Sequence, residues 1–234
     1  MSPESARSAP SRATGPRLSR QRIVEAAIEL VDRDGLEGLS MRKLGQHLGA
    51  DPMSAYHHVG GREGLLAAMA DHVVAGIPLA PSDDQWQGRL RTTIYSARQA
   101  MLRHPWAPRV IIDLPEPTPA ILAYLDAVLG VLRNSGFSLA LTHHALHVLG
   151  SRVLGFGQDL FDDSADARPE DVAGAASSAA LAKALPHVAE LAVAVRHDGG
   201  LGGCDDDEEF AFTLELLLEG LENRRATTAA RPEQ

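Results

Sequence analysis

The sequence predicts an all-α fold in which a group of short N-terminal helices precedes a larger helical domain. Alanine and leucine dominate the apolar residues of the 234-residue chain, and only 4% of its residues are aromatic. Both residues rank high in helix propensity, whereas strands favour β-branched and aromatic side chains. Apolar residues also recur at spacings of three and four, which is the period of an amphipathic helix. Because hydrophobic residues make up 44% of the chain, there is enough material for a sizeable core.

The composition predicts a cytoplasmic protein with no membrane partner. The chain has one cysteine, Cys204, so it forms no internal disulfide and no cysteine-based zinc site. A reducing compartment fits this usage. Its apolar runs are shorter than the roughly 18–20 residues that a spanning helix needs. Residues 1–18 are rich in Pro, Ser and Arg, so we expect a disordered basic arm and no signal peptide.

The first expected helix follows this arm. Ser19 is a suitable N-cap, and Gly35 is a suitable residue to end the helix. Between them one apolar stripe follows the helical period, formed by Ile23, Ala26, Ala27, Leu30 and Val31.

Two shorter helices come next and form the most specific local pattern in the chain. Ser40 is a candidate cap for the first of them, and Gly49 is the turn residue after it. Asp51-Pro52 is a strong start signal for the second, which we expect to end near His58, because the missing N–H of proline costs nothing at the first helical position. Two short helices joined by a tight turn are typical of a helix-turn-helix, whose second helix enters the major groove of DNA.

The expected domain division places a head at residues 19–66 and a larger helical domain at residues 67–224. A fourth helix runs from Arg62 to about Ala75, and Pro78, Pro81 and Ser82 form a joint after it. Helices of the larger domain are expected at about 83–104, 119–134, 138–161, 170–196 and 206–221. A glycine-rich loop at 199–203 precedes the last helix, and residues 225–234 are expected to be a disordered tail.

The charge distribution leaves a nucleic-acid partner open. The formal net charge is −9, which by itself argues against one. However, residues 1–18 carry +2 and residues 19–66 carry −1, so the remainder carries −10. The acidity lies in the C-terminal two-thirds, and the local placement of charge must decide the matter.

A family resemblance supports the helix-turn-helix. The segment SRQRIVEAAIELVDRDGLEGLSMRKLGQHLGADPMSAYHHVGGREGLLAAM resembles the DNA-binding domain of the tetracycline-repressor (TetR) family. The AAIELV run, the LSMRKLGQHLG helix and the MSAYHHV recognition helix carry the likeness. It implies an N-terminal three-helix DNA-binding domain joined to a larger ligand-binding and dimerisation domain. One departure is Ala55, where many relatives carry a bulkier apolar residue.

The resemblance also implies roles for individual residues. Pro52, Met53 and Ser54 would face base edges, and the guanidinium of Arg42 would reach a guanine. The remaining contacts would be to phosphate or sugar, from Tyr56, His57, His58 and Arg62. The alternative for such residues is an ordinary place on the surface or in the core, and Met53 is equally suited to packing.

The second half resembles the family more loosely. NSGFSLALTHHALHVLGSRVLGF is similar in layout to the eighth helix of the tetracycline repressors, which builds a four-helix dimer interface with the last helix. The likeness implies a homodimer, because two reading heads about 34–36 Å apart read more bases than one. The apolar face of the last helix would come from Phe210, Phe212, Leu214, Leu217, Leu218 and Leu221, with intrachain core as the alternative for each.

The expected effector is a small, mostly apolar molecule. Ile111 stands near the position where the tetracycline-binding members carry an imidazole that ligates drug-bound magnesium, so a tetracycline–magnesium pocket is not expected. The candidate pocket residues combine apolar side chains with a few polar anchors: Thr93, Ala97, Tyr124, Leu125, Val128, His143 and His147. Plain core packing is the alternative for each of them.

The histidines of the same segment do not form a complete metal or catalytic motif. His143 and His147 share one helix face, but His144 stands where the zinc-protease pattern needs glutamate, and no third ligand is evident. The acidic run 205–209 is better explained as negative charge at a helix N-terminus. We therefore expect no catalytic residue, no metal and no cofactor.

Together these observations predict a regulator that is not an enzyme. Its partners would be a double-stranded DNA operator, which it would probe as a homodimer, and a small-molecule effector. Ligand binding would shift the fourth helix and change the separation of the two heads. The alternatives are a helical enzyme with a histidine site and a protein–protein adaptor whose head no longer binds DNA.

Overall fold

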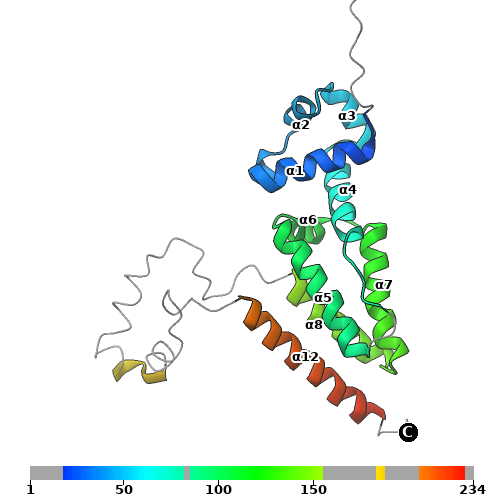
Figure 1. Ribbon diagram of the computed structural model, residues 1–234, viewed down its shortest axis with the longest axis vertical. Helices are drawn as coiled ribbons and strands as arrows, with labels where there is room; N and C mark the ends of the chain where they lie inside the picture. The colour runs from blue at the N-terminus through cyan, green and yellow to red at the C-terminus, as the bar shows by residue number, and fades with distance from the viewer. Residues whose placement is uncertain (1–17, 82–84, 155–182, 188–205, 230–234) are drawn as a thin grey trace, which may run out of the picture. The chain divides into compact units, whose positions relative to one another are not determined.

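The protein is described by a computed structural model that covers residues 18–81, 85–154, 183–187 and 206–229 (Figure 1). The described residues contain helices and turns and no strand, so the all-α prediction is confirmed. Several expectations lie wholly or mainly outside the described residues: the arm, the helix at 170–196, the glycine-rich loop, and the ends of the helix at 138–161 and of the tail.

The helices follow the predicted order. The short N-terminal helices are α1 (Arg20–Gly38), α2 (Met41–Leu48), α3 (Pro52–Val59) and α4 (Gly61–Ala75). They are followed by α5 (Trp86–Arg103), α6 (Ala107–Asp113), α7 (Pro119–Asn134) and α8 (Leu139–Leu154). The last described helix is α12 (Asp206–Ala229), which continues well past the end expected near Leu221.

The helix starts agree with the cap residues that the sequence indicated. The side chains of Ser19, Ser40 and Asp51 accept hydrogen bonds from backbone N–H groups of α1, α2 and α3. Each cap satisfies a donor that a helix start otherwise leaves unpaired. Gly35 breaks the helical conformation within α1, at φ 73° and ψ 168°, so the predicted end of the first helix is confirmed as a kink before a final turn.

The chain divides into two compact units, and the division differs from the expected one. Of the described residues, the head unit contains those up to Val73 and also His104–Thr118, which include α6. The C-terminal unit contains the described residues between Val74 and Arg103 and those from Pro119 onward. Segment 104–118 joins the head because Trp106 is buried and its indole N–H donates to Asp32 of α1. A contact between residues so far apart in sequence has no local signal.

The head unit packs α1, α2 and α3 around a small apolar core that includes Ile23, Leu44 and Leu65. Gly45 lets α2 pass close to α3, since a Cβ there would lie 2.9 Å from both the Ala50 carbonyl oxygen and Pro52 Cγ. Close approach of this kind fixes the angle between the two helices. Ala55 is fully buried on the inner side of α3, where a larger side chain would need more room.

The C-terminal unit is a bundle in which α5, α7 and α8 pack together, with α12 against α8. Its core joins the inner faces of these four helices, and Trp86 stacks edge-on against Phe137 with ring centroids 4.8 Å apart. The links between α12 and α5 include the Arg91–Glu215 ion pair at 2.5 Å, the Arg98–Asp207 ion pair, and the Tyr95 and Phe210 rings with centroids 5.3 Å apart. No helix in the described part of the chain is long and apolar enough to span a membrane.

Candidate DNA interface and effector site

The recognition helix α3 turns most of its side chains outward. Within α3 only Ala55 and Val59 are buried. The exposed positions include most of the residues that the sequence selected for DNA contact: Met53, Ser54, Tyr56, His57 and His58. Pro52 is half-buried at the first helical position, where its ring touches α2. The head therefore presents an outer surface on a short, capped helix, and DNA contact remains a prediction for each residue.

Arg42 completes this surface from α2. It lies in the first turn of that helix and is exposed, and no carboxylate partner is found for it among the residues described here. Lys43, which the sequence analysis did not select, is exposed beside it. The sequence could have indicated Lys43 as well, because it directly follows Arg42 in the first turn of α2. Both suit contact with the negatively charged DNA backbone or with guanine edges.

Arg62 is exposed and also makes contacts within the head, so its expected phosphate contact stays a prediction. Its guanidinium donates to the backbone carbonyl oxygen of Leu39 at 2.7 Å and to that of Leu36 at 3.4 Å. These carbonyls lie where α1 ends and the chain turns into α2. Arg62 therefore ties the start of α4 to the α1–α2 turn, because a guanidinium satisfies carbonyl groups that the end of a helix leaves unpaired.

Three of the expected pocket residues belong to the packed interior. Thr93, Ala97 and Val128 are at most 3% exposed. The Thr93 hydroxyl accepts a hydrogen bond from the backbone N–H of Ala80, at 3.4 Å. Thr93 thereby fixes the chain that leads into α5, and Val128 is part of the apolar core. Leu125 is half-buried on α7.

Tyr124 is the expected pocket residue with the most distinctive environment. Its ring packs against the core of the C-terminal unit, and its hydroxyl is buried with no hydrogen-bond partner among the described residues. Burial raises the pKa of the phenol well above its ordinary value, so the hydroxyl stays protonated. A buried donor without a partner costs about 1–3 kcal/mol, so the site is suited to a ligand that accepts this hydrogen bond.

His143 and His147 lie on the outer face of α8, so their place in an effector pocket stays a prediction. Both are exposed on α8, with ring centroids 4.6 Å apart, while Thr142, Ala145 and Leu149 face inward. The helical period explains the difference, since the inner stripe falls one residue before His143. Among the described residues, no three His, Cys, Asp or Glu side chains are placed to hold a metal ion.

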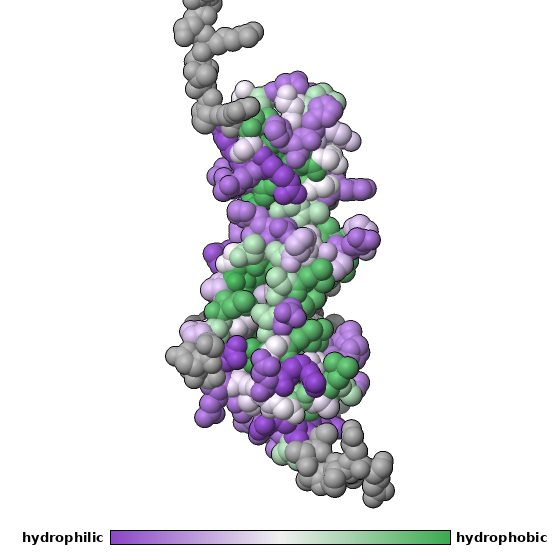
Figure 2. All heavy atoms as spheres, turned by 90° about the vertical axis from the view of Figure 1, so that its right-hand side faces the viewer, coloured by the Kyte–Doolittle hydropathy of each residue, from purple (hydrophilic) through white to green (hydrophobic). Residues whose placement is uncertain are grey.

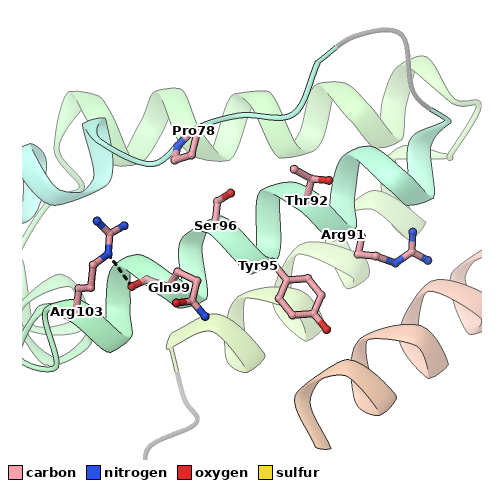
Figure 3. A pocket seen from close by; sticks show the side chains of 7 residues that line it. All are labelled: Pro78, Arg91, Thr92, Tyr95, Ser96, Gln99 and Arg103. Atoms are coloured by element: carbon pink, nitrogen blue, oxygen red, sulfur yellow. Dashed lines mark hydrogen bonds between the residues drawn. The ribbon is translucent and has the colours of Figure 1, made fainter. Parts of the chain in front are cut away.

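A hollow of about 430 Å³ lies along α5 (Figure 3). Thr92, Ser96, Gln99 and Arg103 follow one another along the helix at spacings of four, three and four, which places them on one side. Pro78 faces them from the chain before α5, and Tyr95 and Arg91 lie on the side toward α12. The volume falls in the range of small-molecule sites.

The residues that line this hollow were not among those expected at the effector site. The expected residues of α5, Thr93 and Ala97, follow the inner stripe of the helix. The polar spacing of Thr92, Ser96 and Gln99 was visible in the sequence. However, polar side chains at a helical period are the usual sign of a solvated face, so only the packed structure shows that this face is hollowed.

The comparisons with known proteins match both parts of the chain. A family model described as "Bacterial regulatory proteins, tetR family" matches residues 23–69. A second, described as "Tetracyclin repressor-like, C-terminal domain", matches residues 77–225.

Individual relatives agree with these matches. The HTH-type transcriptional repressor DrrR1 of Streptomyces coeruleorubidus is 28% identical over 221 residues, which cover 91% of this chain and 80% of the relative. Apo ActR of Streptomyces coelicolor superposes with a TM-score of 0.76 at 26% identity, covering 92% of this chain and all of ActR. The complex of ActR with actinorhodin gives 0.74 at 26% identity, covering 89% of this chain and 99% of that one.

The family accounts for the helix-turn-helix and for the helical domain behind it, and its members are regulators of transcription rather than enzymes. The histidine-enzyme alternative is therefore set aside. The second family model alone covers more than half of the chain, so this protein belongs to the TetR family of transcriptional regulators.

Proposed function

We propose that this protein represses transcription by holding a palindromic operator as a homodimer and by releasing it when a small molecule binds the C-terminal unit. The observation that carries the proposal is the outward face of α3, which buries two residues and leaves the polar and aromatic ones free. A helix of this size fits the major groove, which is about 12 Å wide.

The exposed side chains divide into two kinds of DNA contact. Arg42 presents a fork that matches a guanine edge, and Ser54 and Met53 lie at the N-terminal end of α3, which approaches the bases first in this motif. Tyr56, His57 and His58 lie toward the other end and suit phosphate and sugar. The N-terminal end of α3 also favours a nearby phosphate through its unpaired N–H groups.

The proposed effector has a mostly apolar body and a few polar groups. The hollow on α5 offers carbon surface from Pro78, Tyr95 and the stem of Arg103, with hydroxyl and amide groups between them. Tyr124 of α7 is not among the residues that line this hollow, and its unpartnered hydroxyl is a separate candidate anchor. ActR has been crystallised with actinorhodin, which supports a small organic molecule as the class of effector.

The proposed dimer uses apolar residues that the chain does not bury by itself. Phe210, Leu214 and Leu218 of α12 are buried within the chain, which favours intrachain core, the alternative place for these three. In contrast, Phe212 and Leu216 are 63% and 53% exposed one turn apart on the same helix. Leu139 and Val148 are exposed on α8. Figure 2, which faces the right-hand side of Figure 1, shows apolar side chains at the surface among polar ones. A second copy is the occupant that covers such faces.

Binding of duplex DNA tests the proposal. The purified protein would be titrated with DNA from beside its own gene at two salt concentrations, together with an Arg42→Ala/Tyr56→Ala variant. We expect the wild-type protein to bind a palindromic duplex tightly and in a salt-sensitive manner. In the variant the dissociation constant should rise about 5- to 150-fold or more, because the loss of one base contact removes about 1–3 kcal/mol of binding free energy. Arg109→Ala is the control, since Arg109 is equally exposed but pairs with Asp113 on α6.

The outcome also decides between the proposal and its alternative. Binding at the nonspecific level only, to this DNA and to duplexes selected from a random library, would contradict the repressor and favour an adaptor. A molecule that releases the operator must itself bind more weakly when the operator is present, because coupling between two sites is reciprocal.

A further inference from the structure

The carboxylate of Asp32, on α1, accepts hydrogen bonds from two ring N–H groups of the segment that joins α5 to α6. Trp106 Nε1 donates to Asp32 Oδ1 at 2.6 Å. His104 Nδ1 lies 3.0 Å from both carboxylate oxygens, and because a carboxylate only accepts, this ring nitrogen carries the hydrogen. Hydrogen bonds to an ionised acceptor are roughly twice as strong as neutral ones, so the three side chains form a firm cluster.

This cluster lies directly after α5. His104 is the residue that follows Arg103, the last residue of α5, and Trp106 is the N-cap of α6. The backbone N–H of Ala107 donates to the His104 carbonyl at 2.8 Å, which closes a tight turn. Pro105 stands inside this turn with a fixed φ, so the link is short and stiff. A displacement of the C-terminal end of α5 should therefore also displace the His104 and Trp106 rings, because the link between them bends little.

The other side of the cluster leads to the recognition helix. Asp32 lies on α1, which packs against both α2 and α3. The carboxylate is 30% exposed and the imidazole 23%, so water can replace either partner when the cluster opens. The indole of Trp106 is buried, with the whole residue 7% exposed, so its N–H depends on Asp32 for a partner. These features allow both a closed and an open arrangement.

We infer that Asp32 is a positioning residue that couples the effector-binding unit to the DNA-reading helix through α1. The inference rests on the proposed function and adds a second route to it, besides the expected shift of α4. Effector binding beside α5 moves its end, the rings of His104 and Trp106 shift on the carboxylate, and α1 carries α3 with it. By reciprocity, operator binding at α3 must reach the end of α5 by the same route.

Hydrogen exchange with and without operator tests the route and needs no effector. The probe is a duplex recovered with this protein from random-sequence DNA. In the wild-type protein we expect the operator to slow exchange at residues 97–103 and 107–113 by about fivefold or more, the lower end of usual coupling between sites. In Asp32→Asn, which keeps the size but loses the charge that holds both rings, we expect less than a twofold effect there.

Two further variants separate coupling from simple stabilisation. Asp34→Asn is the matched control, since Asp34 is on the same helix but pairs with Arg33, and it should keep the wild-type effect. Trp106→Phe retains the buried ring, removes one hydrogen bond and should give an intermediate effect. A structural role alone would change exchange equally with and without DNA, so the operator-induced difference is the decisive readout.

Each result has one meaning. If the operator slows hydrogen exchange in Asp32→Asn as much as in the wild-type protein, the coupling role is overturned, while the proposed repressor function stands. Absence of slowing at these residues in the wild-type protein would overturn it as well. Failure of the wild-type protein to select any duplex would instead contradict the proposed function itself.

Discussion

The Tyr56 ring of the recognition helix lies against the backbone of Gly61, at the start of α4. A Cβ on Gly61 would be 3.1 Å from the Tyr56 hydroxyl oxygen and 3.2 Å from two ring carbons. Gly61 also has a φ of +91°, which side chains with a Cβ rarely adopt. The contact holds a proposed DNA-binding residue in place while leaving Tyr56 45% exposed.

Gly61→Ala should therefore weaken operator binding as well as stability. We expect a loss of about 1–2 kcal/mol in the free energy of unfolding from backbone strain, and weaker operator binding because the Tyr56 ring must move. Gly60→Ala is the control, since Gly60 has a φ of +74° but open space at its Cβ position. Equal operator affinity for the two variants, measured by fluorescence anisotropy, would show that the position of Tyr56 does not matter.

Arg62→Met should destabilise the head. The substitution keeps much of the apolar stem but leaves the Leu39 and Leu36 carbonyls without their donor. We expect about 1–2 kcal/mol in urea unfolding, in line with hydrogen bonds from a charged donor. Arg42→Met should change stability by less than about 0.5 kcal/mol, as is usual for an exposed residue, and should weaken DNA binding instead. Unchanged stability of Arg62→Met would show that these carbonyl hydrogen bonds do not hold the head together.

Tyr124→Phe should raise the melting temperature of the free protein. It removes a buried hydroxyl that has no partner among the described residues, which relieves a penalty of about 1–3 kcal/mol. Thr142→Val is the comparison, because its hydroxyl is also buried and unpartnered on α8. Only the Tyr124 variant should also bind a releasing molecule more weakly. A lower melting temperature for Tyr124→Phe would mean that the hydroxyl has a stabilising partner.

Phe212→Glu on α12 should dissociate the proposed dimer without unfolding the chain. The side chain is 63% exposed in one chain, so a charge there is solvated in the monomer but buried in the dimer. Sedimentation velocity should show monomers with unchanged helical circular dichroism. Leu218→Glu should unfold the protein instead, since Leu218 is 1% exposed. A Phe212→Glu protein that remains dimeric would move the interface elsewhere.

The Arg91–Glu215 pair should make stability depend on acid pH. The hydrogen bond from Arg91 is the main cause that lowers the pKa of Glu215 below 4.5. A lowered pKa stabilises the fold above the unfolded value and loses that effect as pH falls through the folded value. The melting temperatures of the wild-type protein and Glu215→Gln should therefore differ most near neutral pH and converge below about pH 4.5. The difference should be small because both side chains are more than one-third exposed.

Glu219→Gln serves as the control for this titration. Glu219 is exposed one turn further along α12 and forms no ion pair among the described residues. The melting temperature of the Glu219→Gln variant should follow that of the wild-type protein at every pH. A gap between wild type and Glu215→Gln that stayed constant with pH would show that the ion pair does not titrate as proposed.

Features that depend on a few neighbouring residues could be predicted from the sequence alone. Ser19, Ser40 and Asp51 cap the helices that they were expected to cap, because a cap is a contact across three residues. The outward face of α3 follows from the same reasoning, since the helical period separates Ala55 and Val59 from the rest. The all-α class and the family are sums of such local signals.

Roles that depend on contacts between distant parts of the chain could not be predicted without the packed structure. Arg62 meets carbonyls more than twenty positions earlier, and Trp106 meets Asp32 across 74 positions, so no spacing in the sequence announces either contact. The hollow beside Thr92 and the outward turn of His143 depend on which helix faces pack together. Periodicity shows that a helix has an inner face, but the packing of its neighbours decides which polar residues remain beside a cavity and which face water.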